Sequence, residues 1–215
     1  MAILAGRHHL GTDRGRIVLT TLRDGLAAQA GHDLTIEAAR WSGELVVGDD
    51  LAPASLEVQV DMNSLVVKEG TGGVKPLTDR DRREIAVTAR KVLTADRHPE
   101  ATFSASSFEP AAGGGGVITG TLTLAGRSRP LRLTVISPEP GEYRATTSVT
   151  QTDFGIRPYS AFLGSLKVRD HVGVQVEVSL PGSGQRPDAQ PGSEQSGTAP
   201  SEGAHPEDGA GGKPA

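Results

Sequence analysis

The stretch Val172-Gly173-Val174-Gln175-Val176-Glu177-Val178-Ser179-Leu180 alternates aliphatic residues with small or polar ones throughout. This period of two is typical of a β-strand that turns one face to an apolar interior and the other to solvent. The same alternation recurs upstream, in Leu34–Ala38, Leu56–Met62, Ile118–Leu124 and Leu131–Val135. The sequence therefore predicts a protein built mainly of strands.

Further strand candidates show the alternation less regularly, at Arg16–Leu22, Trp41–Val47, Ala101–Phe108 and Tyr143–Gln151. Turn-forming residues separate the candidates, at Gly48–Asp50, Gly113–Gly116, Gly126–Ser128 and Pro138–Gly141. Short turns between successive strands favour antiparallel pairing. Because each strand has one aliphatic face, we expect an all-β fold in which roughly eight antiparallel strands close into a barrel.

The segment that begins at Thr78-Asp79-Arg80-Asp81 departs from the period of two and resembles a helix. Its apolar residues, Ile85, Ala89, Val92 and Leu93, are spaced as one face of a helix requires. Acidic residues lie in its first turn and basic residues in its last, where their charges interact favourably with the helix dipole. We expect this helix to lie across one end of the barrel, and a shorter helix over Gly25–Ala30.

Composition limits the possible domains and partners. Lys and Arg number 22 against 26 Asp and Glu, a net charge of −4, which does not suit nucleic-acid binding. There are no cysteines. The start, MAILAGRHHLGTDRGR, lacks the apolar run of a signal peptide, and no segment is apolar enough to span a membrane, so we expect a cytoplasmic protein. Residues 1–15 are predicted to be a flexible N-terminus, 16–180 the barrel domain, and 181–215 a disordered acidic tail rich in Gly and Pro.

Catalytic motifs are absent from the sequence. It contains no G-x-S-x-G nucleophile elbow, no P-loop and no G-x-G-x-x-G fingerprint. The six histidines are scattered, whereas a metal site needs three or four converging ligands. We therefore predict a protein that is not an enzyme, with no catalytic residue, no metal site and no cofactor.

Two polar residues are candidates for the barrel rim. His32 lies in Ala30-Gly31-His32-Asp33-Leu34, where a strand begins, and either meets the head of a ligand or pins the loop by bonding its backbone. Asp153 precedes Gly155, and a structural role in that turn is the favoured interpretation, because no partner carboxylate or base is near it in sequence.

The segment Tyr159–Lys167 places Phe162, Leu163 and Leu166 among small residues, between two strand candidates. An apolar loop of this kind needs a surface to cover. It is either a lid at the mouth of an apolar tunnel or a loop that plugs the barrel end, and the sequence leaves both open.

Taken together, residues from about Arg16 to Leu180 resemble the YceI family of lipocalin-like, polyisoprenoid-binding barrels. The motifs that carry the resemblance are Gly31-His32-Asp33, Trp41-Ser42-Gly43, Val58-Gln59-Val60, Thr78-Asp79-Arg80-Asp81-Arg82, Pro99-Glu100-Ala101-Thr102-Phe103-Ser104, Gly120-Thr121-Leu122-Thr123-Leu124, Thr152-Asp153-Phe154-Gly155-Ile156 and Asp170-His171-Val172. The resemblance implies an extended eight-stranded antiparallel barrel with one helix capping an end. It also implies a tunnel that takes an isoprenoid chain, in some members the tail of a quinone.

The predicted ligand is therefore a long apolar lipid, a polyisoprenoid or isoprenoid quinone, held without chemical change. The predicted ligand-binding residues are Leu34, Ile36, Val58, Val60, Met62, Phe103, Ile118, Leu122, Leu133, Val135, Val149, Phe154, Phe162, Leu163, Val174 and Val176, with His32 and Asp153 as polar residues of the rim. Two alternatives stay open: a stress-response or interaction barrel with a filled core, and an enzyme using His32 and Asp153 as an acid/base pair. A homodimer formed through exposed edges or lips is a further hypothesis.

Overall fold

The computed structural model describes residues 3–111 and 115–180. Contacts divide the chain into Met1–Gln185 and Arg186–Ala215, and all the described residues lie in the first unit. The predicted disordered tail, 181–215, lies outside the described residues.

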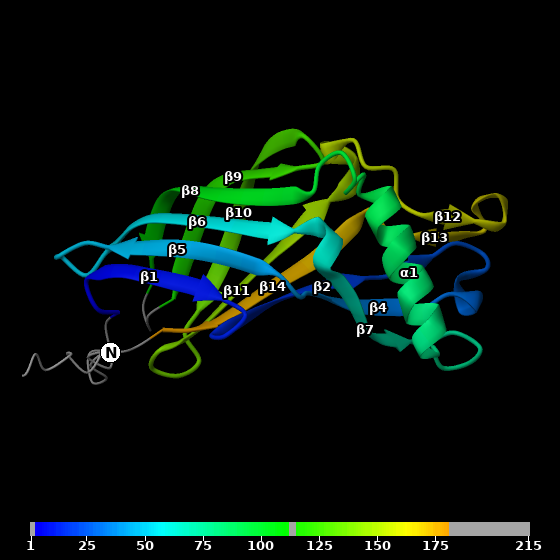
Figure 1. Cartoon of the computed structure of the whole chain (residues 1–215), viewed down its shortest axis with the longest axis horizontal. Coiled ribbons are helices and arrows are strands. Elements are labelled where there is room, and N and C mark those ends of the chain that lie inside the picture. The colour runs from blue at the N-terminus through cyan, green and yellow to red at the C-terminus, as the bar shows by residue number, and fades with distance from the viewer. Residues whose placement is uncertain (1–2, 112–114, 181–215) are drawn as a thin grey trace, which may run out of the picture. The chain divides into compact units, whose positions relative to one another are not determined.

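The fold is mostly β, and its main element is one strongly curled, half-barrel sheet of 11 antiparallel strands (Figure 1). Their order across the sheet is β1-β5-β6-β8-β9-β10-β11-β14-β2-β4-β7. Their bounds are Gly6–Gly11 (β1), Gly15–Thr21 (β2), Asp33–Ala38 (β4), Trp41–Val47 (β5), Pro53–Asp61 (β6), Leu65–Thr71 (β7), Glu100–Pro110 (β8), Gly116–Leu124 (β9), Arg127–Ile136 (β10), Glu142–Thr150 (β11) and His171–Ser179 (β14). A second, 3-stranded sheet has the order β12-β13-β3, formed by Ser160–Ala161, Leu166–Val168 and Arg23–Asp24.

The expected closed barrel of about eight strands is therefore corrected to an 11-stranded half-barrel. One reason for the larger number of strands is that β7, Leu65–Thr71, follows the turn after β6, where no strand was predicted. Another is β1, which pairs with β5 from Gly6↔Val47 to Gly11↔Ser42. Gly6–Gly11 thus belong to the sheet, although residues 1–15 are predicted above to be a flexible segment outside the barrel.

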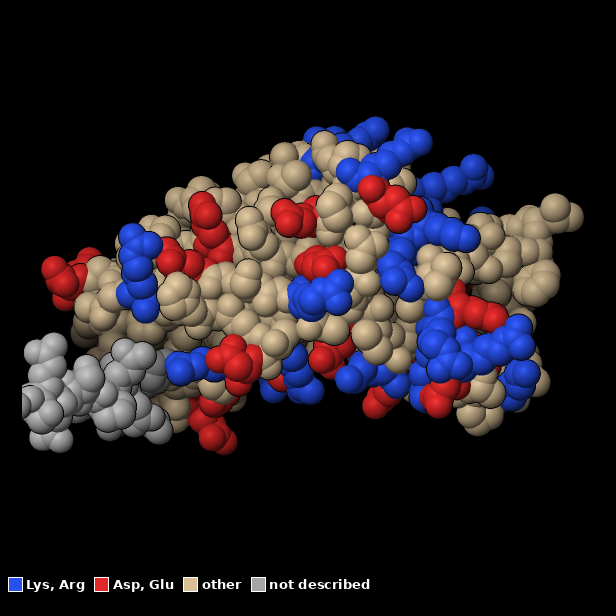
Figure 2. Space-filling view, in the orientation of Figure 1, with Lys and Arg blue, Asp and Glu red and all other residues tan. Residues whose placement is uncertain are grey.

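Alternation along the strands puts aliphatic side chains inside and charged ones outside. Val176 faces Ile17 across the β14–β2 pair, and Ile17 is buried. On the outer face, Glu177 lies opposite Arg16 and accepts a hydrogen bond from its Nε at 2.6 Å. Figure 2 shows Lys, Arg, Asp and Glu side chains interspersed over the outside of the strands. The sheet is thus polar outside and apolar inside, as the period of two predicts.

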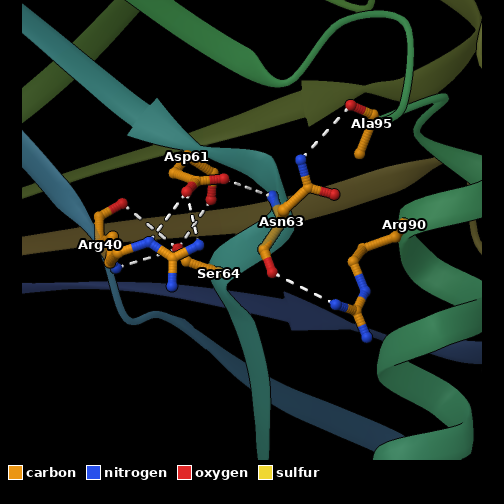
Figure 3. A network of polar contacts seen from close by, with 6 residues as sticks. All are labelled: Arg40, Asp61, Asn63, Ser64, Arg90 and Ala95. Carbon is orange, nitrogen blue, oxygen red and sulfur yellow. Dashed lines mark hydrogen bonds and ion pairs between the residues drawn. The ribbon is translucent and has the colours of Figure 1, made fainter.

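A polar network fixes the corner at which β4 is followed by β5 and β6 by β7 (Figure 3). Ser64, in the 3₁₀ turn Met62–Ser64 between β6 and β7, is buried, and its Oγ accepts from the Arg40 backbone N–H at 2.9 Å and donates to the Asp61 carbonyl at 2.7 Å. The Arg40 guanidinium donates to Asp61 Oδ2 through Nη2 at 2.6 Å and Nε at 2.9 Å. These bonds hold the pKa of the Asp61 carboxyl below its usual range. The network satisfies backbone groups that the interrupted ladders leave unpaired.

The predicted helix is present as α1, Asp79–Val92. Thr78 begins it with a capping box: its Oγ1 accepts from the Asp81 N–H, while the Asp81 carboxylate accepts from the Thr78 N–H at 2.9 Å. The helix packs beside β7 at one end of the half-barrel (Figure 1). In place of the shorter helix over Gly25–Ala30, only a 3₁₀ turn forms, at Ala28–Ala30. Within the described residues, no helix has the length and apolarity needed to cross a bilayer.

Candidate functional site

A large apolar cavity lies inside the curled sheet. Its volume is about 1040 Å³, and strands of the main sheet, together with α1, supply its walls. It reaches Leu51 in the β5–β6 turn and Pro53 at the start of β6 and, at the α1 end, His32 and Lys75. These ends lie at opposite ends of the half-barrel (Figure 1), so the cavity runs along its length. The walls are aliphatic because the inward face of each strand carries Leu, Ile and Val.

Most of the predicted ligand-binding residues line this cavity. Those that do are Leu34, Ile36, Val58, Val60, Met62, Phe103, Ile118, Leu122, Leu133, Val135, Val149, Val174 and Val176. They come from strands β4, β6, β8, β9, β10, β11 and β14 and from the turn after β6. Contact between these side chains and a ligand stays a prediction.

The structure places four of the predicted residues outside the cavity walls. Phe154 is buried in the 3₁₀ turn Gln151–Phe154, beside a smaller pocket of about 210 Å³. Phe162 and Leu163 are exposed at the tip of a loop. Asp153 is exposed in the same turn as Phe154. The carboxylate that organises this turn is Asp170, which accepts from the Thr152 N–H at 2.9 Å.

Several cavity residues were not singled out from the sequence. Trp41 and Leu10 are buried residues of the wall, and Tyr143 is a partly buried one. Burial raises the pKa of the Tyr143 phenol, which keeps it neutral at ordinary pH. Ile85 and Ala89 of α1 also face the cavity. Their helical spacing was visible in the sequence and could have assigned them to the wall.

The α1 end of the cavity has a polar mouth. His32 Nε2 lies 2.8 Å from the Lys75 carbonyl oxygen, which fastens the β7–α1 loop to the start of β4. Gly73, with φ +74°, lies against the His32 imidazole, where a Cβ atom would come within 2.4 Å of Nε2. Arg23 Nη1 donates to the Gly31 carbonyl at 2.9 Å. His32 therefore pins a loop and also lines the cavity, while its contact with the head of a ligand stays a prediction.

His32 and Asp153 are not joined by any hydrogen bond within 3–111 and 115–180. His32 bonds the Lys75 backbone, and Asp153 lies exposed in a turn that Asp170 organises. In the part of the chain that the structure describes, no three His, Asp or Glu side chains gather in a way that could hold a metal ion.

The fold is similar to a solved structure of low sequence identity. A crystal structure of Burkholderia cenocepacia BcnA is similar with a TM-score of 0.56 and 15% sequence identity, over 76% of this chain and 94% of that one. A Campylobacter jejuni YCEI protein gives a TM-score of 0.48 and 18% identity, over 66% of this chain and 81% of that one. The chain matches no curated protein. The profile of the YceI-like domain matches residues 24–180, most of the curled sheet and all of α1, and the chain therefore belongs to the YceI-like domain family.

Proposed function

We propose that this protein binds a long apolar lipid, a polyisoprenoid or an isoprenoid quinone, inside the half-barrel without changing it chemically. The observation that carries the proposal is the cavity of about 1040 Å³ with aliphatic walls. Ligand pockets in proteins are commonly about 300–1,000 Å³. The volume of this cavity lies just above that range, which suits an extended lipid better than a small metabolite. The isoprenoid class comes from membership of the YceI-like family.

The driving force for such binding is burial of the lipid chain. Moving apolar surface out of water contributes about 25 cal/mol per Å², from which the cost of ordering the chain is subtracted. Inward-facing Leu, Ile and Val side chains can pack closely against the lipid and have no polar groups that need a hydrogen-bond partner. An apolar chain needs no polar partner along its length, so walls of this kind match it.

The alternatives have less support. A filled core would leave no space of this size between the strands. An acid/base pair needs its two groups within hydrogen-bond reach of each other and of a pocket. His32 faces the cavity but Asp153 does not, and the hydrogen bonds of His32 go to backbone. The YceI-like family is generally one of non-enzymatic binding proteins.

The experiment compares two neighbouring positions on β6. Val60 lines the cavity, whereas Gln59 is exposed on the other face. In Val60→Asp, a carboxylate enters an apolar space, where an unpaired charge is strongly disfavoured. We expect Val60→Asp to abolish co-purification of lipid and Gln59→Asp to retain it. Lipid per protein is measured by native mass spectrometry and solvent extraction, after circular dichroism has shown both variants to be folded.

Equal lipid content in the two folded variants would contradict binding in this cavity. Extraction of protein purified from its own host identifies the lipid class. A bound lipid without isoprene units would keep the cavity as the site and exclude the polyisoprenoid.

A further inference from the structure

Three loops meet at the α1 end of the half-barrel, formed by residues 25–32, 71–78 and 156–169. The Ala27 N–H donates to the Ser165 carbonyl at 2.8 Å, which joins the first loop to the third. His32 and the Lys75 carbonyl join the first loop to the second. Figure 1 shows β12 and β13, which belong to the third loop, at the same end as α1. The three loops thus form one connected surface, called here the loop face.

The loop face carries bulky apolar side chains that touch little of the protein. Relative exposure is 99% for Leu26, 86% for Val74, 68% for Phe162 and 108% for Leu163, one or two from each loop. Single exposed apolar residues are ordinary, but large ones gathered on one surface mark an interaction site. In Figure 2, the projection at the β12–β13 position is free of charged side chains at its tip.

Local backbone geometry presents Phe162 and Leu163 to the outside. Both have left-handed conformations, with φ of 50° and 54°, which bulky residues seldom adopt. The Ser165 N–H closes this turn by donating to the Phe162 carbonyl at 3.1 Å. Residues held in such conformations tend to occur at functional sites. The turn is anchored at Ser165, so the two side chains project from a fixed base.

The segments of the loop face carry more basic than acidic side chains. The three loop segments, with Leu22–Asp24 before the first and Asp33 after it, contain five basic side chains (Arg23, Lys75, Arg157, Lys167 and Arg169) and two acidic ones (Asp24 and Asp33). Asp24 accepts from the Gly25 N–H at 2.8 Å, and Asp33 accepts from the Arg23 N–H at 2.8 Å and lies 4.0 Å from Arg23 Nε; both carboxylates stay charged, so the basic side chains exceed the acidic ones by three (five minus two). Figure 2 shows many Lys and Arg side chains at this end of the molecule, with some Asp and Glu side chains among them. The loop face is therefore cationic on a chain whose formal net charge is −4.

Apolar tips among cations match an anionic lipid bilayer, in which acyl chains lie beneath phosphate groups. We propose that the loop face docks on an anionic phospholipid bilayer, with Leu26, Val74, Phe162 and Leu163 inserted and Lys75 and Lys167 on the phosphates. Lys75, Lys167 and His32 also line the cavity. Docking in this way sets the cavity mouth against the membrane, where an apolar lipid could pass without crossing water. The four inserted side chains, Leu26, Val74, Phe162 and Leu163, do not line the cavity, so their contact with the membrane does not depend on what the cavity holds.

The test is co-sedimentation of the full-length protein with vesicles. Vesicles of phosphatidylcholine alone are compared with vesicles in which about one lipid in three is phosphatidylglycerol. The double variant Phe162→Ser/Leu163→Ser should lower the partition coefficient about tenfold or more on anionic vesicles, because it removes both inserted side chains. Lys75→Glu/Lys167→Glu should lower it to a similar extent and remove its salt dependence. The matched control is Ile136→Ser on β10, where the side chain is 48% exposed but lies outside the loop face.

Ile136→Ser should bind vesicles as the unchanged protein does. Failure of the unchanged protein to bind anionic vesicles, or equal binding by all the variants, overturns the proposal. If Phe162→Ser/Leu163→Ser instead converts a dimer to a monomer in analytical ultracentrifugation without altering vesicle binding, the partner of the loop face is a second copy. The amount of co-purified lipid is also measured in each preparation, which separates a defect in cavity binding from a defect in docking.

Discussion

Ser64 shows at the scale of one residue how the bend in the sheet is held. Its buried hydroxyl accepts from the Arg40 N–H, between β4 and β5, and donates to the carbonyl of Asp61 at the end of β6. Ser64→Ala leaves the Arg40 N–H and the Asp61 carbonyl without that partner, so we expect the free energy of unfolding to fall by about 1–3 kcal/mol. Ser42→Ala, at an exposed position of β5, should change it by less than about 0.5 kcal/mol. Urea denaturation measures both, and similar losses would mean that the corner network does not stabilise the fold.

Glu177 makes the stability of the fold depend on pH. Its carboxylate accepts from Arg16 at 2.6 Å and from Arg144 at 3.0 Å, and these bonds hold the pKa of Glu177 below its usual value of 4.5. Because the pKa is lower in the folded state, the ion pairs stabilise the fold above pH 4.5, and that stability is lost as pH falls through the folded-state pKa. Glu177→Gln should therefore weaken the decline in unfolding free energy from about pH 5 to about pH 3. Parallel pH profiles for the two proteins would contradict this expectation.

At the scale of elements, the capping box stabilises the start of α1, and one of its two residues, Asp81, also lines the cavity. Thr78→Ala removes the side chain that caps the Asp81 N–H, and should cost about 1 kcal/mol of stability. Thr78→Ser keeps a hydroxyl in place and should cost less. Chemical denaturation followed by circular dichroism compares them. Equal losses would show that the threonine methyl, and not the cap, is what matters.

The elements also show how far sequence reasoning reaches. Strand β5 has the bounds of the candidate Trp41–Val47 although its alternation is less regular, and α1 forms where the helical spacing of Ile85, Ala89 and Val92 predicts a helix. Strand β7 was missed because Val66, on its outer face, hides the alternation of buried Leu65 and Val67. Strand β1 was missed because Leu10 is its sole aliphatic residue. Neither the corner at Ser64 nor the left-handed turn at Phe162 follows from periodicity, since both depend on contacts between distant segments or on local backbone torsions.

At the scale of the whole molecule, the cavity predicts that stability depends on the ligand. A ligand that binds the folded state but not the unfolded chain stabilises the fold by about 2.7 kcal/mol at a concentration of 100 Kd. Protein stripped of lipid should therefore melt below the lipid-loaded protein in differential scanning calorimetry, and re-addition of the extract should restore the melting temperature. Val60→Asp should melt at the same temperature with and without the extract. If the extract does not change the melting temperature of the unchanged protein, that result would count against the cavity as a lipid site.

The place of β14 between β11 and β2 has a consequence for how the chain is made. Its pairing with β2, such as Gln175 with Val18, joins segments at opposite ends of the described chain, whereas β8, β9, β10 and β11 pair with their neighbours in sequence. Such a distant pairing carries a large loop-closure entropy and forms late. During synthesis, the two halves of the sheet stay unjoined, with apolar faces and two open strand edges, until His171–Ser179 has emerged. Emergence of this strand therefore sets the moment from which the nascent chain no longer needs protection from aggregation.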